Sequence, residues 1–318
     1  MEKELDTAVV ELFPKGSKIV VTPHGHSDWA TTERVHTTAP DGSQKEYFLK
    51  TLKADDGDER VRGEYISMSE IYRTLPGIAP EPRGYGKCNK GGAYFFLCDF
   101  LHINKDALPN SVRLGKKLAE LHRKSVSPTG KFGFHCTTFD GKLPLTTGWD
   151  SNWTSFFTKL IRGVYELDIK VNGLWKELDD TMTITFEKLI PRLLDPLTAN
   201  GRAIKPCLIH GDLWESNIGT IEHTEEIYIF DACAYYAHHE KELGIWRCRH
   251  HQLHTPHYRE EYLKNFEASE PKAEFDDRNR LYSVETLLIN SAHSPGSETR
   301  SEALNELNWL VNKYLGEM

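Results

Sequence analysis

Apolar and polar residues alternate in short runs through roughly the first hundred residues of the chain. The first two runs enclose a polar turn, Pro23–Asp28. Such alternation is typical of strands in an antiparallel sheet with one buried face. The expected elements are a short helix over residues 4–13, strands Lys18–Thr22, Glu33–Thr38, Glu46–Thr51, Gly84–Lys87 and Ala93–Phe100, and a helix Glu59–Leu75 that ends at Pro76-Gly77.

The pattern changes to helical spacing after Leu101. Leu114, Leu118 and Leu121 lie on one face of a predicted helix, Val112–Ser125. Further helices are expected at Trp153–Tyr165 and Asp180–Leu194 and near residues 238–252, 256–267, 277–292 and 301–316. The chain therefore predicts an α+β fold with two lobes, a β-rich lobe over residues 1–98 and a mainly helical lobe over residues 99–318.

Two short apolar runs inside the helical region, Pro206–Ile209 and Ile227–Phe230, predict strands that flank a polar segment. This segment reads His210-Gly211-Asp212-Leu213-Trp214-Glu215-Ser216-Asn217, and Asp231 ends the second run. Asn217 follows Asp212 by five residues, and Asp231 follows Asn217 by fourteen. A loop Asp with an Asn and a second Asp on adjacent strands is the arrangement of a kinase-type phosphoryl-transfer site. The sequence therefore predicts the bilobal protein-kinase-like fold.

This arrangement assigns a role to each polar residue of the segment. Asp212 is the candidate general base, which orients an acceptor hydroxyl and takes its proton. Asn217 and Asp231 are the candidate Mg²⁺ ligands, since this hard cation prefers oxygen ligands and shares them with phosphates. His210 is expected to pack the loop instead of taking part in the chemistry.

A kinase-type site also needs a nucleotide side. Lys50 ends an apolar strand and Glu64 follows it by fourteen residues in a helix, the order of the Lys–Glu pair that binds ATP phosphates. Alone, this spacing also fits a solvated strand end. The turn over residues 22–30 has one Gly and fits either a phosphate-covering loop or a plain hairpin turn. The remaining nucleotide candidates are His24, Gly25, His26 and Ser27 in this turn, where the two histidines also fit solvated positions, and Asp99 and Leu101 at the joint between the lobes.

Two absences narrow the acceptor. Gly211 stands where protein kinases have an Arg, and no Ala-Pro-Glu follows Asp231. The chain lacks the long activation segment on which a peptide substrate would lie. A small molecule or a modified side chain is therefore the expected acceptor.

Composition excludes several other classes. The 318 residues carry a net charge of −8, which argues against nucleic acid as the main partner. No apolar run approaches the length of a membrane span, and the acidic N-terminus has no signal-peptide core. Six cysteines without paired spacing predict reduced thiols and a cytoplasmic protein.

Two further groups have competing interpretations. His250 and His254 have the spacing of zinc ligands on one helix face, but Pro256 and the lack of a carboxylate motif favour a polar helix end. An aromatic group at near-helical spacing fits core packing better than a cleft wall; it consists of Trp149, Trp153, Phe156 and Phe157.

The chain resembles the fructosamine kinase family of ketosamine-3-kinases and protein-ribulosamine 3-kinases, relatives of choline kinases and aminoglycoside phosphotransferases. The resemblance spans most of the chain. It rests on LGKKLAELH (114–122), KFGFH (131–135), the Trp149–Phe157 block, HGDLWESN (210–217) and the segment from Phe230 to Leu243. It implies ATP with Mg²⁺ as donor and a ketosamine as acceptor, free or on a glycated protein lysine. Phosphorylation of the 3-hydroxyl would give an unstable product that releases the amine, which is deglycation.

The resemblance also implies residue roles. Lys50 and Glu64 would bind phosphate, Trp214 would line the sugar site, and Glu242 would anchor the catalytic loop from the following helix. Independently of the resemblance, Glu215 fits either a substrate contact with a cationic amine or a solvated position. Glu215-Ser216 departs from the Ser-Gly of the family motif. The bulkier residues predict a tighter cleft that prefers five-carbon ribulosamines to six-carbon fructosamines. A kinase of another small hydroxyl compound, such as an aminoglycoside or a choline-like alcohol, and a pseudokinase scaffold remain the alternatives.

Overall fold

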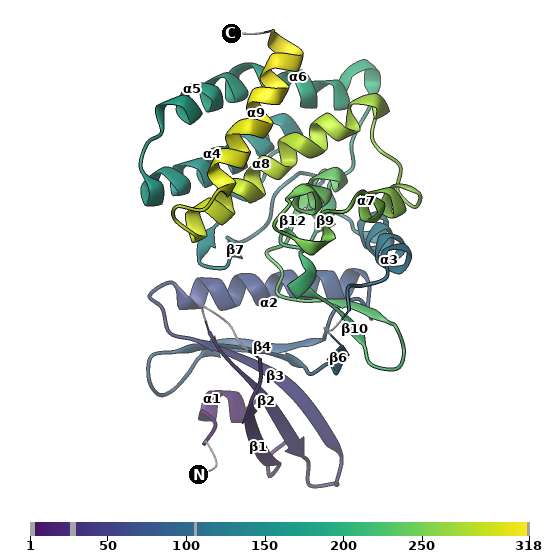
Figure 1. Ribbon diagram of the computed structural model, residues 1–318. Helices are drawn as coiled ribbons and strands as arrows, with labels where there is room; N and C mark the ends of the chain where they lie inside the picture. Colours follow the sequence, from purple (N-terminus) through teal and green to yellow (C-terminus); the bar gives the residue numbers. More distant parts are fainter. Residues whose placement is uncertain (1–3, 26–29, 105–106, 317–318) are drawn as a thin grey trace.

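The computed structural model describes residues 4–25, 30–104 and 107–316. It has a β-rich N-terminal lobe below a helical C-terminal lobe (Figure 1). The predicted α+β, bilobal, kinase-like architecture is confirmed. The N-terminal lobe consists of α1 (Thr7–Val10), α2 (Gly57–Thr74) and an antiparallel sheet in the order β1-β2-β3-β5-β4, with strands β1 (Lys18–Pro23), β2 (Thr31–Thr38), β3 (Gln44–Leu52), β4 (Pro82–Lys87) and β5 (Tyr94–Asp99).

The sheet is covered differently on its two faces. Leu49 of β3 packs with Val9 of the α1 segment in a small cluster on one face. Leu52 of the same strand packs with Val61 of α2 in the main core on the other. Because side chains alternate along a strand, Lys50 faces the same side as Leu52 and points toward α2. This register, with Lys50 opposite Thr32 and Phe96, carries the lysine into the space between the lobes.

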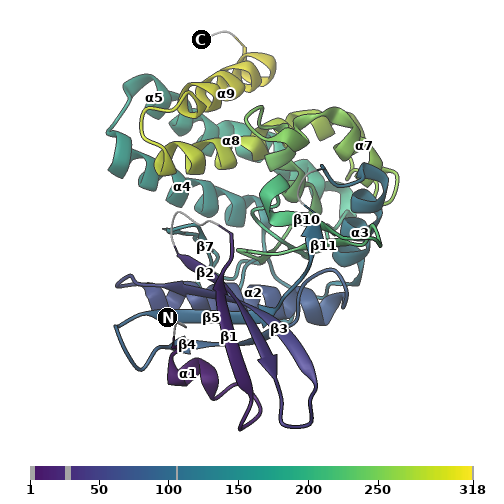
Figure 2. The ribbon, with the colours of Figure 1, turned by 60° about the horizontal axis from the view of Figure 1, so that its bottom comes forward.

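The C-terminal lobe is built around helices, with short strands at its lower end near the N-terminal lobe (Figures 1 and 2). The helices are α3 (Ser111–Lys124), α4 (Trp153–Asn172), α5 (Lys176–Ile184), α6 (Ile190–Leu194), α7 (Pro256–Leu263), α8 (Phe275–His293) and α9 (Thr299–Leu315). The short strands are β6 (Ile103–Asn104), β7 (Phe139–Asp140), β8 (Leu143–Pro144), β9 (Cys207–Ile209), β10 (Ile218–Ile221), β11 (Ile227–Ile229) and β12 (Tyr235–Ala237). β9 pairs with β12 and β10 with β11, so two small ladders hold both ends of the segment 210–217.

The predicted helix near 238–252 is wrong. The chain forms a 3₁₀ helix, His239–Arg247, then a turn and a second 3₁₀ helix, Gln252–His254. Residues 239–246 are buried all round, and Gly244 lies so close to α8 that a Cβ would stand 2.9 Å from the backbone of Tyr282. An amphipathic pattern cannot describe a segment without a solvent face. His250 and His254 consequently do not share an α-helical face.

Other boundaries also differ from the prediction, and the helix expected at Trp153–Tyr165 continues to Asn172. Residues 4–13 contain only one helical turn, α1. The helix expected at Asp180–Leu194 starts earlier and is divided by a π-helical turn, Thr185–Leu189. The aromatic residues Trp153, Phe156 and Phe157 lie in the core, each at most 2% exposed, as the packing interpretation predicted.

The structure bears in part on two expectations, the reduced cysteines and the absence of a membrane span. All six cysteines are free thiols. Among the residues that the structure describes, none of the helices combines the length and the apolar character that crossing a bilayer would require. The boundary between the lobes at residues 98 and 99 stays a prediction.

The contact between α3 and α7 supports the centre of the C-terminal lobe and generates a test. Gly115 of α3 lies against the backbone of α7, where an added Cβ would stand 2.7 Å from the nitrogen of Tyr262. We expect Gly115→Ala to destabilise the protein by about 1–3 kcal/mol, because overpacking outweighs the helix-propensity gain of ~1 kcal/mol. Urea unfolding measures the change.

The exposed neighbour provides the control. Lys116→Ala on the same helix should change the unfolding free energy by less than about 0.5 kcal/mol. A Gly115→Ala variant as stable as the parent protein would show that the two helices separate easily at this point.

Candidate active site

The backbone of the loop 210–217 has a conformation that requires a glycine at position 211. Gly211 has a φ of +89°, and a Cβ there would stand 2.6 Å from the carbonyl oxygen of Cys233. Any side chain at this position would be both strained and in collision. The glycine that replaces the kinase Arg therefore permits a close approach between the loop and the chain after β11.

Glu242 holds the start of this loop from the buried 3₁₀ helix. Its carboxylate accepts hydrogen bonds from the backbone N–H of His210, at 2.5 Å, and of Gly211, at 3.0 Å. Burial alone would raise the pKa of Glu242, but the adjacent His122 and His210 side chains and the backbone N–H lower it below its usual value. Trp246 adds a hydrogen bond from its indole N–H to the carbonyl of Leu213, at 2.7 Å.

His210 joins the loop to the end of β11. Its Nε2 lies 2.9 Å from the carbonyl oxygen of Phe230, and its Nδ1 accepts from the N–H of Asp212 at 3.3 Å. This pattern defines the neutral tautomer with the proton on Nε2. Burial lowers the pKa of His210, which favours the neutral ring. The loop ends are thereby fixed before any substrate binds.

Asp212 lies in the middle of the loop beside Asn217. The amide Nδ2 of Asn217 donates to the backbone oxygen and to Oδ2 of Asp212, both at 2.9 Å. Burial is the largest cause that raises the pKa of Asp212 well above its usual value, followed by the charges of Asp140 and Asp231. A carboxylate with a raised pKa is a better proton acceptor.

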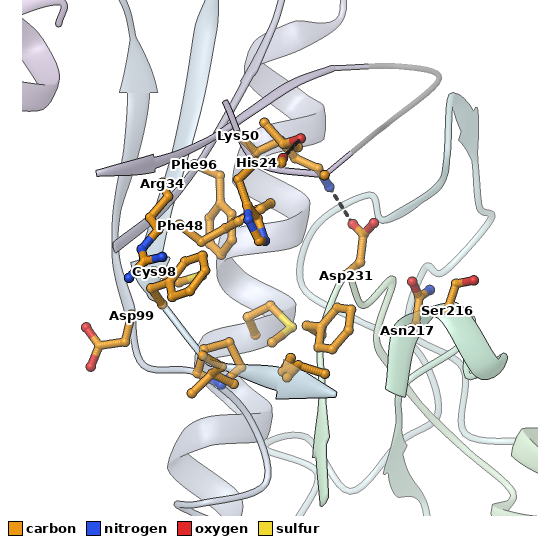
Figure 3. Close-up of a pocket in the computed structure, with 18 of the residues that line it drawn as sticks. His24, Arg34, Phe48, Lys50, Phe96, Cys98, Asp99, Ser216, Asn217 and Asp231 are labelled. Atoms are coloured by element: carbon orange, nitrogen blue, oxygen red, sulfur yellow. Dashed lines mark hydrogen bonds and ion pairs between the residues drawn. The ribbon is translucent and has the colours of Figure 1, made fainter. Parts of the chain in front are cut away.

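One ammonium group joins three elements of the two lobes. Nζ of Lys50 lies 2.9 and 3.1 Å from the two carboxylate oxygens of Glu64 and 2.5 Å from Oδ1 of Asp231 (Figure 3). Despite the opposing effect of burial, the two carboxylates raise the pKa of Lys50. Lys50 in turn lowers the pKa of Asp231, which burial alone would raise. Burial, opposed by Lys50, raises the pKa of Glu64 to about 7. The trio therefore carries one positive and two negative charges when Glu64 is ionised.

Asp231 has an unusual backbone. Its φ is +63°, a left-handed conformation that is rare for a residue with a side chain. Such conformations concentrate at functional sites, where the surrounding structure holds them. Here the turn after β11 directs the carboxylate toward Lys50 and leaves its side chain half-exposed.

Two cavities meet at these residues. The larger, of about 680 Å³, lies between the sheet and the C-terminal lobe. The smaller, of about 370 Å³, is the one that Asp212 lines. Lining residues common to both cavities are Lys50, Glu64, Trp214, Asn217 and Asp231. The charged residues thus stand at the junction, with Asp212 on one side of it.

The predicted nucleotide residues that can be placed lie along the larger cavity. His24 and Gly25 line it from the sheet side, and Asp99 and Leu101 line it at the joint. The carboxylate of Asp99 points away from the centre of the cavity in Figure 3 and binds Arg83 at 2.6 and 2.7 Å. Only its backbone is therefore available to a ligand. The predicted contacts of His26 and Ser27 lie outside the described residues.

The two predicted substrate residues, Trp214 and Glu215, differ in their position relative to the cavities. Trp214 lines both cavities, whereas Glu215 is not among the lining residues described for either. Oε2 of Glu215 lies 3.9 Å from Nδ1 of His251, and His251 does line the smaller cavity. Ser216 lines the larger cavity, on the nucleotide side.

Sequence reasoning missed several residues of the smaller cavity. Arg60 comes from α2, Asp140 from β7 and His293 from the end of α8. No motif or spacing marks them, because they come from elements far apart in the chain. They converge only through the packing of the two lobes.

Comparison with known proteins agrees with this geometry. The family profile described as fructosamine kinase matches residues 22–313. The chain is 28% identical over 269 residues to a chloroplastic protein-ribulosamine 3-kinase of Oryza sativa subsp. japonica, covering 85% of this chain and 72% of the relative. It is 27% identical over 223 residues to the ketosamine-3-kinase of Mus musculus, covering 62% of this chain and 68% of the relative.

Solved structures share the fold. A protein of Thermobifida fusca YX-ER1, provisionally assigned as a fructosamine-3-kinase, superposes with a TM-score of 0.74 at 20% identity, covering 97% of this chain and 99% of its own. Aminoglycoside phosphotransferase APH(4)-Ia superposes with a TM-score of 0.60 at 14% identity, covering 97% of each chain. The profile match over nearly the whole sequence decides the family: this chain belongs to the fructosamine kinase family.

Proposed function

We propose that this protein is an ATP-dependent kinase that phosphorylates the 3-hydroxyl of ketosamines, the adducts of sugars such as ribose or glucose on amines. The observation that carries the proposal is the position of Asp212. It lines a cavity of about 370 Å³, the proposed acceptor space, that meets the larger cavity of about 680 Å³ at Lys50, Asn217 and Asp231. The names of the ribulosamine and ketosamine kinases among the relatives support the substrate class.

The larger cavity is the proposed ATP site. Lys50, held by Glu64, would contact the phosphates, His24 and Gly25 would lie over them, and the backbone of Asp99 and Leu101 would contact the base. Lys50 remains protonated because two carboxylates flank it. The positive charge is therefore available where phosphate would bind.

Asn217 and Asp231 are the proposed Mg²⁺ ligands, and their surroundings fit a hard cation. Nδ2 of Asn217 is used by Asp212, which leaves the amide oxygen for another partner. Asp231 offers a half-exposed carboxylate. Oxygen donors of this kind suit Mg²⁺, which when bound would neutralise charge on the transferred phosphate.

The chemistry proposed for the chain is simple. Asp212 orients the C3 hydroxyl of the ketosamine and accepts its proton. The hydroxyl oxygen then bonds to the γ-phosphorus of ATP, the bond from that phosphorus to the bridging oxygen breaks, and ADP leaves. His210, Asn217 and Glu242 hold the loop that places Asp212.

The biological consequence follows from the product. A ketosamine 3-phosphate decomposes and frees its amine, so the reaction would reverse glycation on small amines or on protein lysines. Six free thiols support a reducing compartment such as the cytoplasm. The intact set of Lys50, Asp212, Asn217 and Asp231 argues against a pseudokinase scaffold. ADP formation that depends on an added ketosamine tests the proposal; ADP formation only with an aminoglycoside or a choline-like alcohol would refute it.

Asp212→Asn should lower kcat with the ketosamine by about 10²–10⁴-fold, because the amide cannot accept the proton. Mg-ATP binding should survive, since Asp212 does not line the larger cavity. Turnover and thermal shift with Mg-ATP measure the two effects. Asp180→Asn, on the exposed surface of α5, is the matched control and should retain full activity. A near-normal kcat for Asp212→Asn would remove this residue from the catalytic role.

Asp231→Ala should abolish activity and weaken Mg-ATP binding together. The variant loses the proposed metal carboxylate and one partner of Lys50. Isothermal titration with ATP, with and without Mg²⁺, measures the change. The gain in affinity that Mg²⁺ gives the parent protein should be lost. If Mg²⁺ strengthens ATP binding to the variant as much as to the parent, Asp231 is not a metal ligand.

We further expect ribulosamines to be preferred to fructosamines. Ser216 lines the larger, nucleotide cavity and not the smaller one, so it does not narrow the acceptor space. The steric argument for a ribulosamine preference therefore depends on Trp214 and on the small volume of the acceptor cavity. One extra carbon with its hydroxyl in a closed pocket changes kcat/KM by about 10–200-fold. A matched pair of lysine adducts at equal pH and Mg²⁺ gives the ratio. Equal values or a fructosamine preference would refute the steric argument and leave the kinase assignment standing.

A further inference from the structure

One wall of the smaller cavity comes from a hairpin and a helix outside the family motifs that drew attention in the sequence. β7 and β8 form this hairpin, in which Asp140 pairs with Leu143 and Gly141 makes the turn with a φ of +52°. β7 lies between α2 and the helices of the C-terminal lobe (Figures 1 and 2). Lining residues from this wall are Phe139, Asp140, Gly141, Thr286, Asn290 and His293.

Asp140 is held in place by the last residue of α8. Nε2 of His293 lies 3.1 Å from both the backbone oxygen and Oδ1 of Asp140. The two side chains are only 18% and 15% exposed. A carboxylate fixed in this way needs little reordering to bind a ligand, which favours affinity.

The charges around the cavity are not balanced. Its described lining contains four carboxyl groups but only one lysine and one arginine; the carboxyl groups belong to Glu64, Asp140, Asp212 and Asp231, and the cations are Lys50 and Arg60. Burial raises the pKa of Glu64 to about 7 and the pKa of Asp212 well above its usual value. Lys50 is already bound by Glu64 and Asp231. The nearest described ion-pair partner of Arg60 is Asp56, and the distance between their charged atoms is 3.8 Å.

His250 and His251, which also line this cavity, do not supply positive charge to it. Burial lowers the pKa of His250 below its usual value. Burial, followed by the charge of His250, lowers the pKa of His251 to about 3. Both rings are therefore neutral near pH 7. Apart from its histidines, the ionisable groups that line the smaller cavity are thus mostly acidic.

We propose that the carboxylate of Asp140 binds the protonated secondary amine of the ketosamine and so selects ketosamines over uncharged ketoses. This inference rests on the proposed function. In a ketosamine the nitrogen is attached to C1, two carbons from the C3 that bears the reacting hydroxyl. An aliphatic secondary amine is charged at neutral pH, and its two N–H groups suit a fixed carboxylate. Asp140 and Asp212 then contact the same substrate at the amine and at the hydroxyl.

The test compares two acceptors on two proteins. The acceptors are a ribulosamine of an aliphatic amine and the matched ribulose ether, in which oxygen replaces the amine nitrogen. Asp140→Asn should lower kcat/KM for the amine about 10–100-fold, the usual effect of losing a charge-assisted hydrogen bond, mainly through KM. kcat/KM for the ether and KM for ATP should remain close to those of the parent protein. Equal losses for both acceptors, or no loss for the amine, would overturn the proposal.

Two further measurements guard the result. Asp140→Glu keeps the charge and should retain more of the preference for the amine than Asp140→Asn does; an equal loss in both variants would contradict a charge effect. If Asp140→Asn fails to fold, the proposal can be tested on the parent protein alone by comparing two ribulosamines. The parent protein should use an aniline-derived ribulosamine, uncharged at pH 7, less efficiently than the aliphatic one, and equal use would overturn the inference. A parent protein that phosphorylates neither ketosamine would instead refute the proposed function.

Discussion

One ammonium group between two carboxylates is the constraint on which the site depends. Lys50 comes from the sheet, Glu64 from the helix that covers it, and Asp231 from the turn after β11 in the other lobe. Lys50 and Glu64 are nearly buried, so an unpaired charge on either would be costly, and the half-exposed Asp231 pairs with Lys50 from the other lobe. The ion pair therefore aligns the lobes. When both carboxyl groups are ionised the three groups have one negative charge in excess, which fits a site that binds a divalent cation with phosphate.

The loop 210–217 is also held by buried polar contacts. Its backbone N–H groups are bound by the buried Glu242, and that carboxylate lies 3.5 Å from Nε2 of His122 on α3. Nδ1 of His122 lies 2.7 Å from the hydroxyl of Tyr262 on α7. A chain of buried polar groups thus links the packing of the helical lobe to the position of Asp212. Such a network is costly if incomplete, so it fixes one geometry.

The sequence predicts the parts of this site that lie on local patterns. Lys50, Asp212, Asn217 and Asp231 follow from strand ends and loop spacing, and the structure brings them together. The segment 238–252 was mispredicted because apolar periodicity assumes a solvent face, and this segment has none. Asp140 and His293 could not be found, since 153 residues separate them and only the packing of β7 on α8 joins them. Glu215 is predicted to contact the substrate, but it is not among the described lining residues of the smaller cavity, where its neighbour His251 is.

The central claim is that phosphate is transferred to the C3 oxygen of a ketosamine. Phosphorus NMR of the purified protein with Mg-ATP and a lysine ribulosamine labelled with ¹³C at C3 tests it most directly. The account predicts one new phosphomonoester signal, coupled to the labelled carbon, that grows in step with ADP and then decays to inorganic phosphate as the amine appears. A phosphomonoester without that coupling, or ADP formation without any acceptor-dependent signal, would contradict it.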